Sequence, residues 1–176
     1  MKPDWIIVHH SGGSDLNPLQ DSSDFTFAQC EALHKQRFNL RSFLGFYTGY
    51  QYYIDKTGKV WHARLDTETG AHTIGFNTSS IGICLAGNFD ATLPTDAQVN
   101  ALRTLLQEKM KQWCIPLANI VPHRFAAPKT CYGKRLSDEW ARIIASEDPA
   151  EIERLTKQLQ ELKEMLEQLI RLKGRY

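Results

Sequence analysis

The sequence lacks the features that would assign it to a membrane or to a polyanionic partner. Its net charge is +1 over 176 residues, so no field across the whole molecule favours nucleic acid. No run of about 20 apolar residues is present, which argues against stable membrane insertion. Residues 1–10 hold one lysine and only a short apolar run, and we therefore expect no signal peptide and synthesis in the cytoplasm.

Cysteine is scarce, with four in the chain, and its spacing is irregular. Cys30, Cys84 and Cys114 stand in apolar contexts, which predicts small buried thiols rather than a disulfide framework. Cys131 differs, because lysine, threonine, tyrosine and glycine surround it in a stretch typical of a loop. Of the four thiols, that of Cys131 is the candidate for chemistry.

Signals for strands and helices alternate through the first 147 residues. The expected elements are strands at 5–10 and 80–87, a β-hairpin over 50–63 with Gly58 at its turn, and helices at 26–38, 95–113 (behind a capping box) and 137–144, the last capped by Ser137. Interleaved strands and helices indicate an α/β fold, with a mixed central sheet flanked by helices. The hairpin makes part of that sheet antiparallel.

The character of the sequence changes at Asp148-Pro149. From residue 151 to 173 glycine and proline are absent, and leucine or isoleucine recurs at alternating spacings of three and four. This pattern predicts a coiled-coil-like amphipathic helix over 148–176, behind a domain of residues 1–147. Two roles stay open for this tail: a homo-oligomer formed through residues 151–173, or docking on the domain. Its balanced charge disfavours a helix lying on a membrane.

The stretch "HRFAAPKTC" at 123–131 places a histidine and a cysteine at the ends of a short irregular segment. Imidazole and thiolate are typical zinc ligands, and a hydrolytic zinc site usually has three protein ligands and leaves its fourth position to water. His123 and Cys131 could supply two of the three. Lys129, close to the sulfur in sequence, indicates that such a metal would take part in chemistry.

The third ligand should come from a distant element. His9 and His10 end the first predicted strand, and only one of them can face the metal because successive strand side chains point to opposite faces. His72 lies in a glycine-punctuated loop and is a candidate for ligand or substrate contact. His34, on a predicted helix, is expected at the surface or in packing. Spacing alone does not choose among the candidates.

Four segments together resemble the zinc amidases of the N-acetylmuramoyl-L-alanine amidase family. They are "VHHS" at 8–11, "GYQYYIDKTGKV" at 49–60, "GAHTIGFNTSSIGICLAGNFD" at 70–90 and "HRFAAPKTC" at 123–131. The family includes phage amidase endolysins, and eukaryotic peptidoglycan-recognition proteins share its fold. The resemblance implies a peptidoglycan hydrolase that cleaves the amide between N-acetylmuramic acid and L-alanine. It also implies synthesis in a host cytoplasm and action on the cell wall after release.

The resemblance also implies a site. Zn²⁺ would be held by His9, His123 and Cys131. Tyr50 and Lys129 would be catalytic: Lys129 stabilises the charge that grows on the carbonyl oxygen, and Tyr50 positions water and passes a proton to the departing amine.

Further expectations concern the substrate and the alternatives. His72, Phe76 and Asn77 are substrate-contact candidates. Gln51 departs from the family, where histidine is common at that position. Three alternatives remain at this point. One is a non-catalytic peptidoglycan-binding module, although such members usually lack the cysteine retained here. The second is an amidase that also regulates a phage RNA polymerase. The third is a structural component of a larger particle, to which the predicted coiled coil tethers the amidase.

Overall fold

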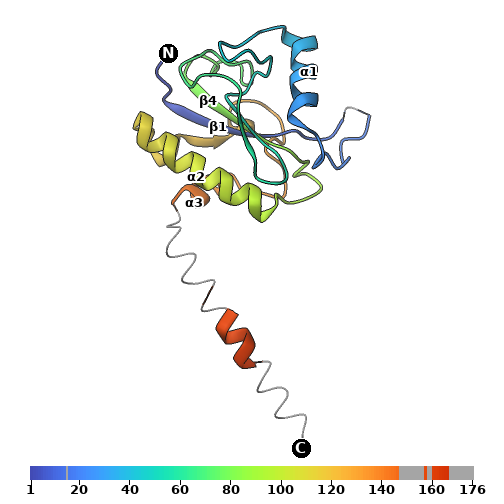
Figure 1. Cartoon of the computed structure of the whole chain (residues 1–176), viewed down its shortest axis with the longest axis vertical. Helices are drawn as coiled ribbons and strands as arrows, with labels where there is room; N and C mark the ends of the chain where they lie inside the picture. The colour runs from blue at the N-terminus through green and yellow to red at the C-terminus, as the bar shows by residue number, and fades with distance from the viewer. Residues whose placement is uncertain (15, 147–156, 158–159, 167–176) are drawn as a thin grey trace, which may run out of the picture. The chain divides into compact units, whose positions relative to one another are not determined.

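Strands from distant parts of the sequence form one five-stranded sheet in the computed structural model, which describes residues 1–14, 16–146, 157 and 160–166 (Figure 1). The strands follow the spatial order β3-β2-β4-β1-β5. Their bounds are β1 (Trp5–His10), β2 (Tyr52–Ile54), β3 (Val60–His62), β4 (Ser80–Leu85) and β5 (Ile120–Pro122). The predicted mixed sheet is thereby confirmed.

The central strands are parallel and the hairpin is antiparallel. β1 pairs in parallel with both β4 and β5, and β2 pairs in parallel with β4. β2 and β3 form the antiparallel hairpin, whose turn has Gly58 at φ +83°, a conformation that favours glycine. The short strand β5 was not expected from the sequence. Its pairing with β1 brings the segment that follows it to the carboxyl edge of β1.

Two helices cover opposite faces of the sheet, with β1 and β4 running between them in Figure 1. Helix α1 (Phe27–Phe38) and helix α2 (Asp96–Trp113) both begin with a complete capping box. Thr26 and Gln29 form the first box, and Thr95 and Gln98 form the second. Both helices lie where the sequence predicts them.

The face under α2 holds the larger core. Leu102, Leu105 and Leu106 of α2 pack on the inward side chains of the strands. The other face carries a smaller cluster of buried residues: Phe27, Cys30, Tyr53, Ala63, Cys84 and Ala86. Because side chains alternate along a strand, neighbouring residues of β1 and β4 serve different faces.

Two local expectations were wrong. The thiol of Cys114 is exposed, because this residue ends α2 in a left-handed conformation, φ 56°, and follows its last turn. Cys30 and Cys84 are buried as expected. Helix α3 (Trp140–Ser146) contains Trp140, Ile143 and Ile144 as expected, but it begins three residues after the expected cap, Ser137, whose backbone carbonyl accepts a turn hydrogen bond from the Trp140 N–H.

Internal contacts divide the chain into two units, Met1–Ala145 and Ser146–Tyr176. Of the second unit, residues 160–166 are helical, and their exposed side chains include Leu162, Met165 and Leu166. The rest of the predicted coiled-coil pattern falls largely outside the described residues, so the coiled coil stays a prediction. No helix in the described part of the chain is long and apolar enough to span a membrane.

Candidate metal centre

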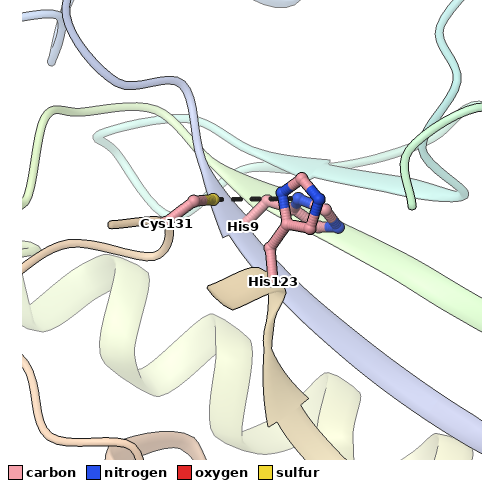
Figure 2. Close-up of side chains that lie close together, drawn as sticks. All are labelled: His9, His123 and Cys131. Carbon is pink, nitrogen blue, oxygen red and sulfur yellow. Dashed lines mark hydrogen bonds between the residues drawn. The ribbon is translucent and has the colours of Figure 1, made fainter. Parts of the chain in front are cut away.

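Three side chains from separate segments converge at the carboxyl edge of the parallel strands (Figure 2). His9 is the next-to-last residue of β1, His123 begins the short helix η2 (His123–Phe125), and Cys131 lies in the loop beyond it. One nitrogen or sulfur atom from each lies within 4.8 Å of the others. The Nδ1 atom of His9 is 3.8 Å from the sulfur of Cys131. The cluster can therefore hold a metal ion.

Strand pairing explains the convergence. β1 and β5 are parallel, and Val8 of β1 pairs with Pro122 of β5, so His9 and His123 follow at the same edge. The rings of His9 and His123 lie 4.5 Å apart, measured between centroids. The adjacent His10 points to the other face, where its Nδ1 accepts a hydrogen bond from the Phe89 N–H. Its ring is thus committed to the fold.

The electrostatics keep the two imidazoles neutral. Burial, followed by the neighbouring histidines, holds the pKa of His9 well below its usual value. Burial and then Lys129 lower the pKa of His123 to about 4. A neutral imidazole has a lone pair available for a cation, and protonation would remove it. At neutral pH both rings are therefore in a form that can bind a metal.

Cys131 is prepared differently. Burial raises the pKa of its thiol to about 12, and the His10 N–H, Lys129 and Arg124 oppose that effect. The backbone N–H of His10 lies 3.4 Å from the sulfur, as a donor to it, and the Lys129 cation also favours the thiolate. A bound cation would complete the deprotonation, because a coordinating thiol loses its proton.

The loop that carries Cys131 is fixed by Arg124. Its guanidinium donates to the backbone carbonyls of Thr130, Gly133 and Leu136, and it forms an ion pair with Asp138. The Thr130 hydroxyl in turn donates to Asp90, at 2.7 Å. These bonds position the sulfur without regular secondary structure. Periodicity in the sequence does not reveal them.

Tyr50 and Lys129 line the same cavity as the cluster. The cavity has a volume of about 560 Å³ and is lined by His9, His10, Ser11, Gly12, Gly13, Ser14, Pro18, Tyr50, Asp90, His123, Lys129, Thr130 and Cys131. The ring of Tyr50 is 5.0 Å from that of His9. Burial raises the pKa of Tyr50 well above its usual value, so its hydroxyl keeps its proton. The side chain of Lys129 is exposed at the cavity.

His34 has a supporting position that the sequence did not reveal. Of the two positions expected for it, surface or packing, the structure shows packing: His34 is buried, and its Nδ1 accepts a 2.8 Å hydrogen bond from the Gly49 N–H, one residue before Tyr50. Its ring lies 5.1 Å from that of Tyr50. A histidine in an amphipathic helix gives no sign of such a partner.

The three predicted substrate contacts lie in one segment but have different surroundings. Asn77 accepts hydrogen bonds from the backbone N–H groups of His72 and Thr73. Phe76 makes edge contacts with Trp5 and Phe125. The ring of His72 contacts His9, with 3.1 Å between His72 Nδ1 and His9 Nε2. Substrate contact by these residues stays a prediction.

The fold and the cluster define a class: an α/β protein with a candidate single-metal site at the carboxyl edge of its parallel strands. Comparison with known proteins gives the family. A model described as N-acetylmuramoyl-L-alanine amidase matches residues 1–134, and the chain belongs to that family.

Individual relatives agree with this assignment. The chain is 35% identical over 99 residues to an endolysin of Klebsiella phage KP32, covering 53% of this chain and 64% of that protein. It is 30% identical over 137 residues to the endolysin of Escherichia phage T7, covering 70% and 89%. Against the solved structure of the Clostridium intestinale endolysin amidase LysCS the TM-score is 0.64, with 24% identity, covering 81% of this chain and 83% of that one. The last likeness concerns the fold.

Proposed function

We propose that the protein is a zinc-dependent amidase that cleaves the bond between N-acetylmuramic acid and L-alanine in peptidoglycan. The observation that carries the proposal is the meeting of His9, His123 and Cys131 in a chain that belongs to this family. The phage relatives with the name endolysin support the same reading.

The donor set fits zinc. Two imidazole nitrogens and one thiolate sulfur are zinc ligands of the kind found in open, catalytic sites. In a tetrahedral zinc site a nitrogen and a sulfur ligand are about 3.6 Å apart. The His9 Nδ1 and Cys131 Sγ atoms, at 3.8 Å, are close to that separation. When bound, zinc supplies a water of lowered pKa and polarises the carbonyl oxygen of the scissile amide.

Two further residues complete the proposed site. Lys129 is a cation at the cavity and stabilises the negative charge that develops on the carbonyl oxygen. Tyr50 keeps its proton, so its hydroxyl can donate a hydrogen bond to water or to the departing amine. The leaving nitrogen must gain a proton, because an amide anion is too basic to leave.

The test is digestion of purified sacculi by the zinc-loaded protein, followed by mass spectrometry of the products. We expect stem peptides with a free L-alanine amino terminus and glycan strands with an intact lactyl group. Cleavage at a different bond would contradict the proposed reaction. Binding of the sacculi without any cleavage would favour the non-catalytic peptidoglycan-binding module.

The family also supports a place of action. We propose synthesis in a host cytoplasm and access to the wall after the membrane is opened. Expression in bacteria should then leave cells intact until the inner membrane is permeabilised, when turbidity falls rapidly. Rapid lysis with an intact membrane would contradict this order of events.

The tail is proposed as an element of self-association. Leu162 and Leu166 are 61% and 58% exposed in the described helical segment, so they are available to a partner chain. Sedimentation should show more chains per particle for the full chain than for a chain that ends at residue 147. The same number of chains per particle in both cases would contradict the proposed homo-oligomer and would favour docking as the role of the tail.

A further inference from the structure

We propose that His72 and Thr73 form an outer support of the metal centre, which holds His9 in the orientation and tautomer that metal binding requires. This inference rests on the zinc site of the proposed function, and it adds residues to that site. It gives His72 a positioning role beside a ligand.

The two nitrogens of His9 point in opposite directions. Nδ1 faces the sulfur of Cys131 at 3.8 Å, so it is the nitrogen available to the metal. Nε2 lies 3.1 Å from Nδ1 of His72 and 3.3 Å from the hydroxyl oxygen of Thr73. A nitrogen that binds a metal cannot carry a hydrogen. In neutral His9 the hydrogen is therefore on Nε2, facing the supporting pair.

The supporting pair can accept that hydrogen. Nδ1 of His72 and the hydroxyl of Thr73 are 3.0 Å apart, and both are within reach of His9 Nε2. The Nε2–H group of His9 donates either directly to Nδ1 of His72 or to the hydroxyl of Thr73, which then donates to Nδ1 of His72. Each arrangement requires Nδ1 of His72 to be without a hydrogen. A partner of this kind fixes the ring of a metal-ligating histidine and strengthens its basicity.

The pair is itself held rigidly. The side-chain oxygen of Asn77 accepts hydrogen bonds from the backbone N–H groups of His72, at 2.9 Å, and Thr73, at 2.8 Å. The His72 ring lies against Gly82 in the middle of β4, where a Cβ atom would come within 2.6 Å of it. Glycine weakens a strand interior, so its presence there is explained by the ring that occupies the space.

The ring of His72 has little access to a molecule bound in the cavity. Its Nδ1 faces His9 and Thr73, and its Nε2 is shielded from solvent. The cavity at the cluster is lined by other side chains. The environment of His72 therefore suits a support for a ligand.

The experiment measures zinc affinity by chelator competition on the full chain. Three substitutions of His72 separate the hydrogen bond from simple loss of the ring. His72→Ala removes the acceptor, and His72→Gln places its amide near the former Nε2. His72→Asn places an amide oxygen near the former Nδ1. His62→Ala, on the exposed strand β3, is the matched control for loss of a histidine.

We expect zinc affinity to fall about 10–100-fold in His72→Ala and His72→Gln, the range found for outer partners of metal ligands. His72→Asn should recover most of the loss, and His62→Ala should bind as the wild type does. Affinity within twofold of wild type in His72→Ala would overturn the proposal. Equal losses in all three His72 variants would also overturn it, since they would indicate loosened packing rather than a lost acceptor.

Two substitutions of Thr73 keep the proposal testable if His72→Ala does not fold. Thr73→Ser keeps the hydroxyl and Thr73→Val removes it at nearly constant shape. Lower zinc affinity in Thr73→Val alone supports the proposal, and equal affinity in the two, with His72→Ala unfolded, overturns it. Sacculus digestion by the wild type is scored separately. A wild type that binds zinc and cuts nothing refutes the proposed function. Altered zinc affinity in the variants would even then support the positioning role of His72 and Thr73.

Discussion

The two faces of the sheet differ in what their side chains do. The face under α2 is packed with aliphatic residues, among which Ile6, Val8, Ile83 and Leu106 are fully buried. The face under α1 carries a smaller cluster, in which aromatic rings such as Phe27 and Tyr53 pack with the thiols of Cys30 and Cys84. His9, in register with Cys84, belongs to this face. The difference arises within single strands: Val8 packs under α2, and the next residue, His9, faces the cluster.

Because of this alternation, neighbouring residues of one strand have different roles: one packs in the core and the next belongs to the site. In β4, Ile83 fills the α2 core and its neighbour Gly82 leaves room for the ring of His72. Burial of large apolar side chains provides the main stabilising free energy of folding. On the face under α1, which we call the site face, polar groups of the site take the place of some apolar side chains, so this face contributes less of that free energy. We therefore expect substitutions on the two faces to affect different measurements.

The largest expected effect is that of Cys131→Ala on the site face. Loss of the thiolate removes one of the three proposed ligands, so it should weaken zinc binding more than any other substitution considered and abolish sacculus cleavage. The stability of the zinc-free protein should change little, because the loop is also fixed by Arg124. Cys114→Ala, at an exposed thiol, is the control and should leave zinc binding and cleavage unchanged. Cleavage at the wild-type rate by Cys131→Ala would refute the metal assignment.

Lys129→Ala should come next. Removing one preorganised group that stabilises a developing oxyanion typically lowers kcat about 10²–10³-fold. Zinc affinity should be nearly retained, since Lys129 is not among the three side chains of the cluster. The matched control is Lys134→Ala, a nearby exposed lysine outside the cavity lining. Steady-state kinetics on sacculi would show the contrast, and equal kcat for both variants would remove Lys129 from the mechanism.

Leu106→Ala tests the opposite face. Truncating a fully buried leucine should lower the free energy of unfolding by about 2–5 kcal/mol, because it leaves a cavity in the α2 core. Zinc affinity of the folded protein should stay at the wild-type value. Leu93→Ala, at a leucine that is 56% exposed, should cost less than about 0.5 kcal/mol. Urea unfolding gives the first quantity. A parallel loss of zinc affinity would show that the faces are coupled.

Local sequence patterns predicted much of the fold. Strand β1, helices α1 and α2 and the hairpin have signals contained within their own residues, such as the capping box at Thr95. The three-residue strand β5 has no such signal, because it exists through its pairing with β1. The exposed Cys114 was missed for a related reason: an apolar neighbourhood in sequence does not show that the chain turns outward after α2.

The candidate site depended on information beyond periodicity. Alternation along β1 implied that one of His9 and His10 faces a metal, and the family resemblance favoured His9, which the structure brings to His123 and Cys131. The supporting contacts of His34 and Thr73 could not be predicted. Each joins atoms far apart in sequence, and neither residue type signals its partner.

The smallest expected effect concerns pH and the site face. Burial, then Arg37 and Arg64, lower the pKa of His34 to about 4 from its unfolded value of 6.5. Between those values the unfolded chain binds more protons than the folded one, so stability is lost as the pH falls. From pH 7 to pH 5 this histidine should contribute about 2 kcal/mol of that loss.

His34→Asn isolates this contribution. The amide oxygen can still accept from the Gly49 N–H, and it does not titrate in this range. The zinc-free variant should therefore lose about 2 kcal/mol less stability than the wild type between pH 7 and pH 5, as measured by urea unfolding. An unchanged slope in His34→Asn would show that the acid sensitivity lies with other buried histidines, and that the support beneath Tyr50 is independent of pH.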